Sequence, residues 1–212
     1  MKHFLVFGAS GSIGKECVKS LSPLGEVTHG DRDFQKLLNE TTHFDAVVWA
    51  QGLNISDSIG DFDLDSYQNV LDANITFLLK SANWLKQNDK INESCQFVVI
   101  SSIWSQISRP NKLTYSISKA AVSAAVRSIA VDLGPSGVQA NAIAPGPIES
   151  PMTRKNLSSE QIADLVDQTP NKRLVTLGEV ANIVARFANA EMSGITGQEI
   201  VVDGGWSVSK LV

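Results

Sequence analysis

Two short segments of this 212-residue chain are apolar at every position, and they restrict the possible folds more than any other feature of the sequence. Residues 46–50 read AVVWA and residues 97–100 read FVVI. A strand with one face in water alternates apolar and polar residues, whereas a strand that helices cover on both faces is apolar throughout. The two segments therefore indicate the interior of a parallel sheet.

Six segments are candidate strands: 3–8, 26–30, 46–50, 96–101, 138–143 and 199–202. They are rich in apolar and β-branched residues, and segments with helical periodicity separate them. This alternation predicts a doubly wound α/β fold, with about six parallel strands and helices on both faces of the sheet. We expect one domain over residues 1–212, because the length suits a single core and no linker or repeat interrupts the chain.

The composition excludes several classes of function. Apolar residues make up 43% of the chain and charged residues 19%, which is typical of a folded globular protein and not of a disordered or membrane protein. The net charge is −4 and no run of like charges occurs, so we expect neither a nucleic-acid partner nor a membrane surface. A small molecule is the expected partner.

The cysteines and histidines predict no disulfide and no metal site. Cys17 and Cys95 lie far apart and match no metal-binding spacing, so we expect free thiols in a reducing compartment. His3, His29 and His43 show no ligand spacing either. The chain begins MKHFLVFGAS without a signal-peptide core, and no apolar run reaches membrane-spanning length. We therefore expect a cytoplasmic protein.

A glycine-rich turn, VFGASGSIGKE, follows the first candidate strand and precedes a helix that we expect to begin near Ile13. Glycine permits a tight turn and lets the backbone approach a pyrophosphate, which the N–H groups and the dipole of the helix then bind. Such a turn can also be a plain loop. Its place at the start of a βαβ unit favours a dinucleotide site with these contact residues: Gly8, Ser10, Gly11, Ser12, Ile13 and Gly14.

The second candidate strand ends in THGDRD, which bears on the choice of cofactor. Asp31 is placed where a carboxylate can accept hydrogen bonds from an adenosine ribose and repel a 2′-phosphate, and this favours NAD over NADP. Arg32 follows directly and can bind the same phosphate by a bidentate contact. Both residues can also be solvated turn residues. We expect NAD or NADP, with a modest preference for NAD.

The segment VVISSIWSQISRPNKLTYSISKAAV carries the candidate catalytic residues. Ser102 ends a buried strand, at the edge where ligands of open α/β sheets bind. Tyr115 comes 13 residues later, and Lys119 lies one helical turn beyond it. A tyrosine and a lysine at this spacing share a helix face whether or not they act together. Combined with Ser102 and the glycine turn, however, the pair indicates a catalytic set.

The glycine turn and the Ser102, Tyr115 and Lys119 set resemble those of the short-chain dehydrogenase/reductase family, a Rossmann-type group. The usual turn of the family reads TGxxxGxG. Here Phe7 stands at the threonine position and Ser12 at the middle glycine, and the spacing GxxGxxG is closer to the extended branch of the family. The resemblance covers nearly the whole chain.

The resemblance implies a role for each member of this set. Tyr115 would act as the acid in reduction or as the base in oxidation, and Ser102 would hydrogen-bond the substrate oxygen. Lys119 would hold the nicotinamide ribose, and its charge would lower the pKa of the tyrosine. Asn74, in DANITF, matches the asparagine that supports a proton-relay water, although it could equally be a polar residue at a helix surface.

Two more segments resemble cofactor contacts of the family. WAQG, residues 49–52, stands where the family usually has NNAG, and NAIAPGPIESPM resembles the proline-glycine segment beside the nicotinamide, although it could also be a plain turn. The implied contacts are Ala50, Gln51, Gly52, Pro145, Gly146, Ile148 and Ser150, together with Asn74, Tyr115 and Lys119. Residues 195–207, ITGQEIVVDGGWS, resemble the last strand and C-terminal turn, which in many members pack at a tetramer interface. We therefore expect a homodimer or homotetramer.

One segment is shorter than in the family. Only 13 residues, 32–44, separate Asp31 from Asp45 at the start of the next strand, which leaves room for one helix and no additional strand. Family members normally have a further strand and helix here. The chain therefore resembles a shortened member with a six-stranded sheet, in which the aspartate that usually meets the adenine has no secure counterpart.

The substrate side involves two segments. Residues 145–157 form a proline-rich irregular stretch, and an amphipathic segment over 158–168 follows, beginning SSEQ in the manner of a capping box. We expect this insertion, near 145–170, to cover the site. Five apolar side chains could line a pocket or could equally belong to the core: Trp104, Ile107, Leu113, Met152 and Leu157.

These observations predict an NAD(P)-dependent oxidoreductase that transfers a hydride between a nicotinamide cofactor and a carbonyl or secondary alcohol, with Tyr115 as acid or base. Two alternatives stay open. A non-catalytic dinucleotide-binding sensor or scaffold fits the shortened adenine side, but it does not require Ser102, Tyr115, Lys119 and Asn74. An epimerase of the extended branch is disfavoured because the chain lacks a C-terminal substrate domain.

Overall fold

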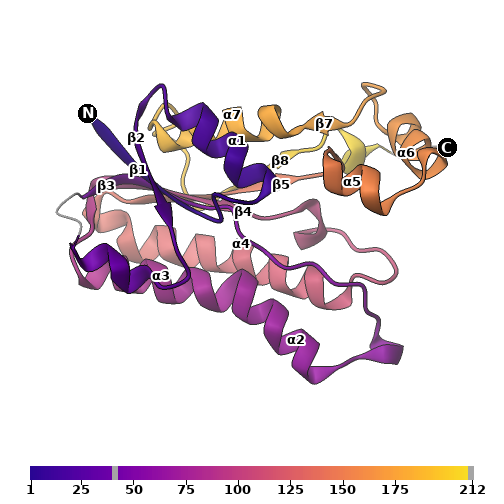
Figure 1. Cartoon of the computed structure of the whole chain (residues 1–212), viewed down its shortest axis with the longest axis horizontal. Coiled ribbons are helices and arrows are strands. Elements are labelled where there is room, and N and C mark those ends of the chain that lie inside the picture. The colour runs from indigo at the N-terminus through magenta and orange to yellow at the C-terminus, as the bar shows by residue number, and fades with distance from the viewer. Residues whose placement is uncertain (40–42, 210–212) are drawn as a thin grey trace.

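The computed structural model of the chain describes residues 1–39 and 43–209, and its centre is a six-stranded sheet (Figure 1). The strand order is β2-β1-β3-β4-β5-β8, and every neighbouring pair is parallel. The prediction of a doubly wound α/β fold with about six strands is confirmed. The strands are β1 (Lys2–Phe7), β2 (Gly25–Gly30), β3 (Phe44–Trp49), β4 (Ile91–Ile100), β5 (Gln139–Pro145) and β8 (Glu199–Val202).

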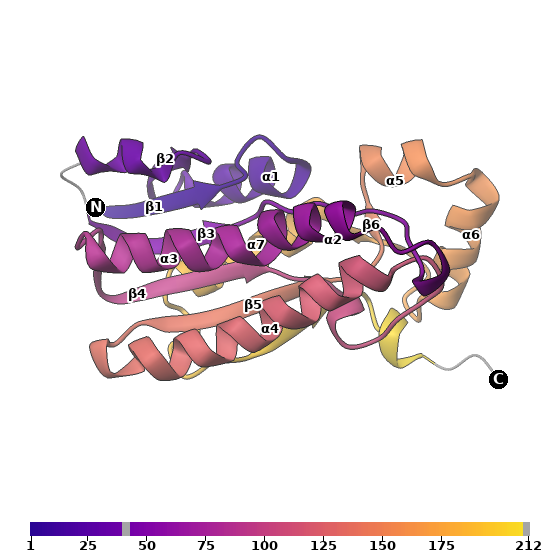
Figure 2. The same ribbon diagram turned by 90° about the horizontal axis from the view of Figure 1, so that it is seen from below.

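Helices cover both faces of the sheet, as Figures 1 and 2 show. On one face lie α1 (Ser12–Leu21) and α7 (Leu177–Ala188), which pack against each other. On the other face lie α3 (Phe77–Gln87) and α4 (Leu113–Leu133), and α2 (Leu64–Leu71) leads into α3. No helix in the described part of the chain is long and apolar enough to cross a membrane.

Successive side chains of each central strand point to opposite faces of the sheet. In β1, Phe4 and Val6 pack with α1 and α7, whereas Leu5 and Phe7 pack with α3 and α4. All four are at most 1% exposed. Because burying one such side chain contributes about 1.5–3 kcal/mol, strands that are apolar throughout stabilise two cores at once. This explains why the AVVWA and FVVI segments carry no polar residue.

The predicted strand limits agree with the structure to within two residues, except in β4. That strand begins at Ile91, five residues before the predicted start, and Ile91 pairs with Phe44. A register shift follows before Gln96 pairs with Ala46. The polar residues 92–94 interrupt the apolar pattern in this stretch, and Ser94 has a positive φ of 65°. The sequence pattern therefore revealed only the apolar half of the strand.

The connection from β2 to β3 contains one 3-10 helix, Phe34–Asn39, where one helix was expected. The ring of Phe34 lies 6.0 Å from that of Phe77 and 5.5 Å from that of Trp84, so this short helix packs against α3. In the part of the connection that the structure describes there is no additional strand. Accordingly β2 pairs with β1 alone and forms one edge of the sheet.

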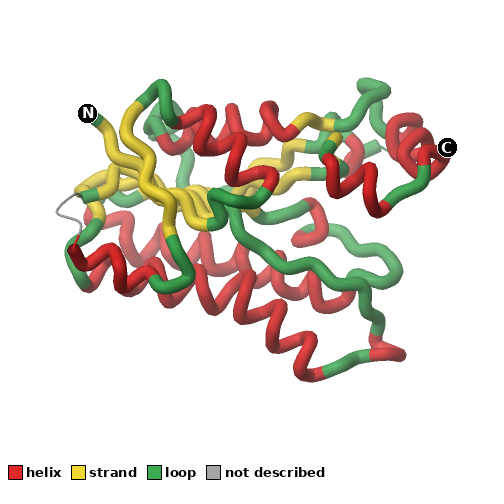
Figure 3. The backbone as a smooth tube through the Cα atoms, viewed as in Figure 1, coloured by secondary structure: helices red, strands yellow, loops and turns green. Residues whose placement is uncertain are grey.

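The segment after β5 lies at the carboxyl ends of the strands, where Figure 3 also shows the long loops that follow β3 and β4. It contains β6 (Ile148–Glu149), α5 (Pro151–Asn156), α6 (Ser159–Gln168) and β7 (Val175–Thr176), and β6 pairs with β7 in parallel. The predicted capping box is present at the start of α6. Ser158 Oγ accepts from the Gln161 N–H at 3.1 Å, and Gln161 Oε1 accepts from the Ser158 N–H at 3.0 Å.

Candidate active site

The site residues that the sequence predicts lie where the strand order of the sheet reverses. From β1 the chain passes outward to β2 and then returns to β3 on the other side of β1. Phe7 and Trp49 are paired at the ends of β1 and β3, and the Ala50 N–H donates to Phe7 O at 2.9 Å. A crevice at such a switch point is where ligands of open α/β sheets bind. The glycine turn and residues 50–52 therefore lie side by side at this edge.

The glycine turn permits close approach of backbone to backbone. Gly8 has φ of +76°, and a Cβ there would lie 2.5 Å from the Gln51 nitrogen; a Cβ at Gly14 would lie 2.1 Å from Gly8 O. Only glycine fits these two positions. The N-terminus of α1 has no side-chain cap and no acidic residue in its first turn. Its N–H groups and the positive end of its dipole suit a pyrophosphate.

Other residues of this turn differ in their exposure. Ser10, Gly11 and Ser12 are exposed, and the Gly11 N–H donates to Gly8 O at 3.0 Å. The side chain of Ile13, in contrast, packs against the core below α1. The exposed residues lie where a ligand can reach them, whereas Ile13 offers a ligand only its backbone.

Residues 50–52 fit a polar ligand. Gln51 Oε1 is buried and has no hydrogen-bond partner among the residues that the structure describes. Such an acceptor costs free energy until a donor, such as a ribose hydroxyl, meets it. A Cβ at Gly52 would lie 3.3 Å from Asn74 Oδ1 and 3.5 Å from Lys119 Nζ, so this backbone runs directly beside two predicted catalytic residues. Together with the glycine turn, these residues fit a dinucleotide.

A second cation, Lys36, lies beside Asp31 at the predicted adenosine corner. Asp31 accepts hydrogen bonds from Lys36 Nζ at 2.9 Å and from the Asp33 N–H at 3.1 Å, and the bond from Lys36 holds the pKa of Asp31 below its usual range. Arg32 is exposed. Two cations, Arg32 and Lys36, thus flank the carboxylate that was predicted to select NAD, and Lys36 neutralises part of its charge.

Asn74 is 3% exposed and lies in a turn of π-helix, Asp72–Thr76, between α2 and α3. Turns of this kind occur often at functional sites. Asn74 Oδ1 accepts from the Leu53 N–H at 2.7 Å, and Nδ2 donates to Leu53 O at 2.9 Å and to Ser118 Oγ at 2.8 Å. Ser118 Oγ in turn donates to Tyr115 O at 2.8 Å. Asn74 therefore ties the loop after β3 to the helix that carries Tyr115.

Lys119 is buried beside Tyr115. Its side chain is 3% exposed, Nζ donates to Ile100 O at 2.9 Å, and Nζ lies 5.7 Å from the centroid of the Tyr115 ring. Burial lowers the pKa of Lys119 to about 8, and the negative charge of Glu199 opposes that shift. Lys119 is thus a cation that titrates close to neutral pH.

The pKa of Tyr115 moves in the opposite direction to the expected one. Burial raises it, and a hydrogen bond with the Ser102 hydroxyl opposes the rise. The expected net lowering of the Tyr115 pKa is therefore wrong for this structure, because burial outweighs the effect of the Lys119 ammonium, which donates to Ile100 O. The hydrogen bond nevertheless shows that Ser102, which is 7% exposed, reaches the tyrosine hydroxyl.

The proline-glycine segment is held against the last strand. Pro145 pairs with Val202, and the Gly146 N–H donates to Val202 O at 3.0 Å. Ile148 O accepts from the Thr153 hydroxyl at 2.6 Å, and Ser150 Oγ caps α5 by accepting from the Thr153 N–H at 3.1 Å. Ile148 and Ser150 therefore already have partners within the segment, so their predicted contacts with a carboxamide remain predictions.

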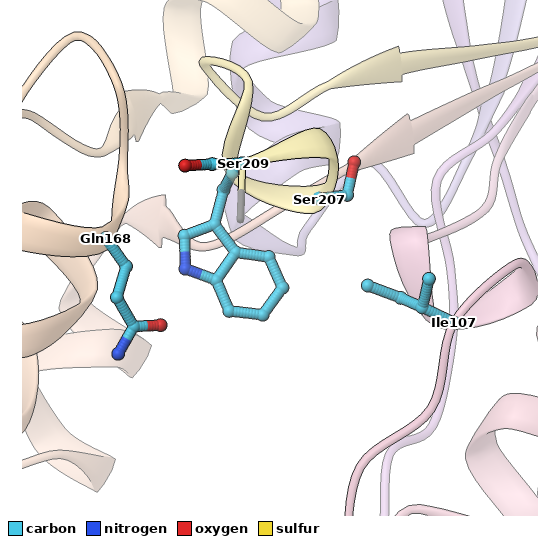
Figure 4. A pocket seen from close by; sticks show the side chains of 5 residues that line it. Ile107, Gln168, Ser207 and Ser209 are labelled. Carbon is cyan, nitrogen blue, oxygen red and sulfur yellow. The ribbon is translucent and has the colours of Figure 1, made fainter. Parts of the chain in front are cut away.

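Two adjacent cavities open at the same edge. One, of about 340 Å³, is lined by residues that include Trp104, Arg109, Leu157 and Trp206. The other, of about 330 Å³, also touches Trp206 and has Ile107 and Gln168 on opposite sides, as Figure 4 shows. Three of the five predicted pocket residues, Trp104, Ile107 and Leu157, are thus lining residues. Leu113 lines neither cavity, and the side chain of Met152 lies outside the described part of the structure.

Several polar contacts around the site were not foreseen. Lys112 Nζ donates to Asn54 Oδ1 at 2.7 Å and lies 5.6 Å from the centroid of the Tyr115 ring. The carboxylate of Asp57 accepts from the N–H and the hydroxyl of Thr114. Their partners lie more than 50 positions away in the sequence, and no local pattern marks such pairs. Trp206 lines both cavities and was not predicted to do so. It directly follows Gly204 and Gly205 in the C-terminal turn, and this glycine pair was the sequence signal that could have pointed to it.

Among the described residues, His, Cys, Asp and Glu side chains do not form a group that could hold a metal ion. The fold and the site define a doubly wound α/β protein whose switch point fits a dinucleotide beside Ser102, Tyr115, Lys119 and Asn74. A family profile described as enoyl-(acyl carrier protein) reductase matches residues 26–207. The chain belongs to the short-chain dehydrogenase/reductase family of NAD(P)-dependent oxidoreductases.

Similar proteins of known sequence agree with this assignment. The uncharacterized oxidoreductase YmfI of Bacillus subtilis is 27% identical, over 97% of this chain and 98% of its own length. Glucose 1-dehydrogenase of Gluconobacter oxydans is 29% identical over 85% of this chain and 70% of its own. The 3-oxoacyl-acyl-carrier-protein reductase MabA of Mycobacterium tuberculosis is 30% identical over 82% and 70%.

Solved structures show the same fold. A short-chain dehydrogenase family protein of Francisella tularensis superposes with a TM-score of 0.88 at 23% identity, covering 99% of this chain and all of its own. The aldohexose dehydrogenase of Thermoplasma acidophilum gives 0.89 at 24% identity, covering 100% of this chain and 96% of its own. The shortened connection after β2 therefore leaves the rest of the architecture intact.

Proposed function

We propose that this protein transfers a hydride between a nicotinamide cofactor and a carbonyl or secondary alcohol, with Tyr115 as the group that moves the proton. The observation that carries the proposal is the convergence of Lys119, Tyr115, Ser102 and Asn74 beside Gly52, at the switch point of the sheet. Names of similar proteins, among them glucose 1-dehydrogenase, cyclopentanol dehydrogenase and 3-oxoacyl-acyl-carrier-protein reductase, support this substrate class.

The bound nicotinamide supplies or accepts the hydride at its C4 carbon. Tyr115 then gives its hydroxyl proton to the substrate oxygen in reduction, and Ser102 donates a hydrogen bond to the same oxygen while negative charge develops there. Because burial raises the pKa of Tyr115, its hydroxyl is protonated at neutral pH. This protonation state suits Tyr115 as the acid of a reduction.

Lys119 and Asn74 support that proton transfer. The Lys119 ammonium stabilises the tyrosinate that remains after the transfer, since opposite charges attract strongly in a buried site. It also lies beside Gly52, in position to hold ribose hydroxyls. Asn74 fixes the first turn of α4 through Ser118 and in this way orients Tyr115. We propose in addition that Asn74 anchors the water that returns a proton to the site.

We propose NAD as the preferred cofactor, with Asp31 as the selecting residue. Its carboxylate would accept hydrogen bonds from the adenosine ribose and repel a 2′-phosphate. Arg32 and Lys36 oppose this preference, because either cation can bind that phosphate. Asp31→Ser should therefore shift the ratio of the Kd values for NADPH and NADH in favour of NADPH. A ratio that is unchanged by the substitution would contradict this role of Asp31.

We propose a homodimer or homotetramer as the assembly, because residues 195–207 resemble the segment that packs at subunit interfaces in many family members. Sedimentation of the intact protein tests this statement. A single species with the mass of one chain, at micromolar concentration, would contradict it.

A panel of cofactors and carbonyl compounds tests the proposed function. NADH and NADPH binding is followed by fluorescence, and turnover by the loss of cofactor absorbance with assorted ketones and aldehydes. The proposal expects binding and turnover with at least one class of carbonyl compound. Tight binding of both cofactors without turnover of any ketone, aldehyde or secondary alcohol would instead favour the sensor or scaffold alternative.

A further inference from the structure

The larger cavity is connected to Ser102 through Trp104, one of its lining residues. The Trp104 N–H donates to Ser102 Oγ at 3.3 Å. A lining residue of the cavity is thus hydrogen-bonded to the hydroxyl that is predicted to bind the substrate. The lining residues come from four segments. Trp104 and Arg109 follow β4, Gly146 and Pro147 follow β5, and Trp206 lies in the C-terminal turn. The remaining lining residues lie in and around α5 and α6: Thr153, Leu157, Gln161, Asp164 and Leu165. A volume of about 340 Å³ suits a small ligand.

Two tryptophans form the apolar part of this cavity. The rings of Trp104 and Trp206 meet edge to face with centroids 5.8 Å apart, and Leu157, Leu165 and Pro147 add aliphatic surface. Trp206 Nε1 is buried and has no acceptor within the described chain. The wall therefore offers a hydrocarbon surface, which suits a ligand that has an apolar body.

Arg109 adds a positive charge to this cavity. Its guanidinium lies 5.6 Å from the centroid of the Trp104 ring and forms no ion pair with the residues that the structure describes. A guanidinium stacked on a ring keeps its N–H edge available for a bidentate contact. Burial and the charge of Arg109 both lower the pKa of Lys112, so two cations lie near each other here. Asp164 on α6 is the single acidic residue among the lining residues, and it too forms no ion pair in the described part of the chain.

We propose that the substrates are small oxo or hydroxy compounds that carry a carboxylate, which Arg109 binds, on an apolar body that lies against Trp104 and Trp206. This proposal rests on the proposed function and names its substrate class. A carboxylate on Arg109 forms charge-assisted hydrogen bonds that a neutral ester cannot form, whereas both compounds present the same body and the same reacting carbonyl. The acid should therefore be the better substrate.

Pairs of short-chain oxo acids and their methyl esters test this proposal. We expect a higher kcat/KM for the acids, and Arg109→Gln should lower kcat/KM for the acids by about 10- to 100-fold while leaving the esters within about threefold. Asp164→Asn is the matched control in the same cavity, since it removes a like charge and should not weaken the acids. Arg127→Gln, at an exposed position of α4, controls for a change of overall charge.

The outcomes separate this proposal from the proposed function. Equal losses for acids and esters in Arg109→Gln, or a wild-type preference for esters, would overturn the carboxylate proposal while turnover itself still supports an oxidoreductase. No turnover of any acid, ester or neutral ketone would overturn both. As a readout without turnover, carboxylates should quench tryptophan fluorescence in the wild type and not in Arg109→Gln.

A second inference comes from an independent set of contacts, those of Glu199 at the start of β8. Its Oε1 accepts from Ser123 Oγ at 2.5 Å, and its Oε2 accepts from Ser105 Oγ and Gln106 Nε2, both at 2.8 Å. Ser105 and Gln106 belong to the loop that follows Ser102, whereas Ser123 lies on α4. One carboxylate thus joins the loop of the serine to the helix of the tyrosine.

The contact on α4 leads directly to Lys119. Ser123 Oγ also lies 3.1 Å from Lys119 O, so its single proton is shared between this carbonyl and Glu199. Ser105 Oγ likewise lies 2.7 Å from Ser102 O and shares its proton between that carbonyl and Glu199. Since catalytic groups act only within a narrow range of distances, a link that fixes both backbones fixes the separation of their side chains. We infer that Glu199 is a positioning residue, which holds Ser102 and the Tyr115–Lys119 pair in register.

The charge of Glu199 adds a second effect. Two ionisable groups face Lys119, Tyr115 from its own helix and Glu199 from β8, and Lys112 lies near the same tyrosine ring. Burial lowers the pKa of Lys119, and Glu199 raises it toward its usual value. Removing the charge should therefore lower this pKa further, so that Lys119 loses its proton at a lower pH.

Two substitutions separate the positioning effect from the charge effect. Glu199→Gln keeps hydrogen-bonding atoms and removes the charge, so we expect the alkaline limb of kcat/KM to move to lower pH. Glu199→Ala removes both, so we also expect faster hydrogen exchange in residues 102–107 and a fall in kcat of about tenfold or more. Glu191→Gln, which alters an exposed ion pair with Arg186, is the control and should change neither. An unshifted limb in Glu199→Gln, with unchanged exchange in Glu199→Ala, would overturn this inference.

Discussion

Lys119 is a buried residue whose environment departs strongly from that of a free lysine side chain. Burial lowers its pKa to about 8, against 10.5 for an ordinary lysine. A group of this kind is charged below pH 8 and neutral above it. We predict that the rate of carbonyl reduction falls as the pH rises through about 8, because the cation that supports Tyr115 is lost.

The matched variant for this prediction is Lys119→Arg. A guanidinium stays protonated throughout the accessible range, so whatever activity remains should show no limb near pH 8. Lys119→Met, which cannot carry a charge, should be inactive at every pH. A wild-type limb that persists unchanged in Lys119→Arg would show that another group titrates there.

Gly14 is a second residue with a sharp steric requirement. A Cβ at this position would lie 2.1 Å from Gly8 O, so Gly14→Ala must displace the glycine turn. We predict a loss of about 1–3 kcal/mol in the free energy of unfolding and a weakening of NADH binding by at least about tenfold. Denaturant titration and fluorescence measure the two effects.

Gly134→Ala is the control for that substitution, because nothing lies within 4 Å of a Cβ there. It should leave NADH binding unchanged. Equal NADH affinity in Gly14→Ala and the wild type would mean that the turn does not contact the cofactor.

At the scale of the element, α4 is stabilised from outside its own sequence. Lys112, the residue at its N-cap, makes no capping bond, and the carboxylate of Asp57 accepts from the N–H and hydroxyl of Thr114 instead. Asp57 is 7% exposed and Thr114 is fully buried. We predict that Asp57→Ala destabilises the protein by about 1–3 kcal/mol, because it leaves buried donors without an acceptor.

The same substitution should also lower kcat, since Tyr115 lies in the first turn of α4. Asp63→Ala provides the comparison, because Asp63 caps α2 with an exposed carboxylate that accepts from the Ser66 N–H at 2.8 Å. It should destabilise the protein less than Asp57→Ala does and leave kcat unchanged. A loss of kcat in Asp63→Ala as large as that in Asp57→Ala would contradict a specific role for the cap of α4.

Elements with strong local patterns could be predicted from the sequence, and those that depend on distant partners could not. The fully apolar strand segments, the glycine turn and the capping box at Ser158 have local causes, and all three are present. The first half of β4 and the Asp57 cap depend on residues far away in the chain, so no window of neighbouring residues contains their signal.

The candidate site shows the same division. The sequence predicted that Ser102, Asn74, Tyr115 and Lys119 belong together, and the structure places them side by side. The direction of the Tyr115 pKa shift was wrong, because it depends on burial and on where the Lys119 ammonium points. The partners Lys36 and Glu199 were missed for the same reason. Which residues act in catalysis stays a prediction until variants are measured.

At the scale of the whole molecule, the two cores lie on opposite faces of one sheet, and each contains one free cysteine. Cys95 is in the core below α3 and α4, and Cys17 is in the core below α1 and α7; both are 0% exposed. Burial raises the pKa of Cys17 to about 12 and that of Cys95 well above its usual value. Since thiolates are the reactive form, neither thiol should react in the native protein.

We predict that a thiol reagent does not label either cysteine until the core around it opens. Under native conditions, the labelling rate of Cys17 and that of Cys95 should each report the opening of its own core. Mass spectrometry of labelled peptides measures each site. Rapid labelling of Cys95 or Cys17 in the native protein at pH 7 would show that the corresponding core opens locally.

The central claim is that Tyr115 moves the proton that completes hydride transfer, and Tyr115→Phe tests it most directly. This substitution removes one oxygen and keeps the ring near Lys112 and Lys119, so the Kd for NADH should stay within about threefold of the wild type. With a carbonyl compound that the wild type reduces, kcat should fall by about 10²- to 10⁴-fold, which is the usual contribution of a general acid. Full turnover by Tyr115→Phe, with unchanged NADH binding, would contradict the account.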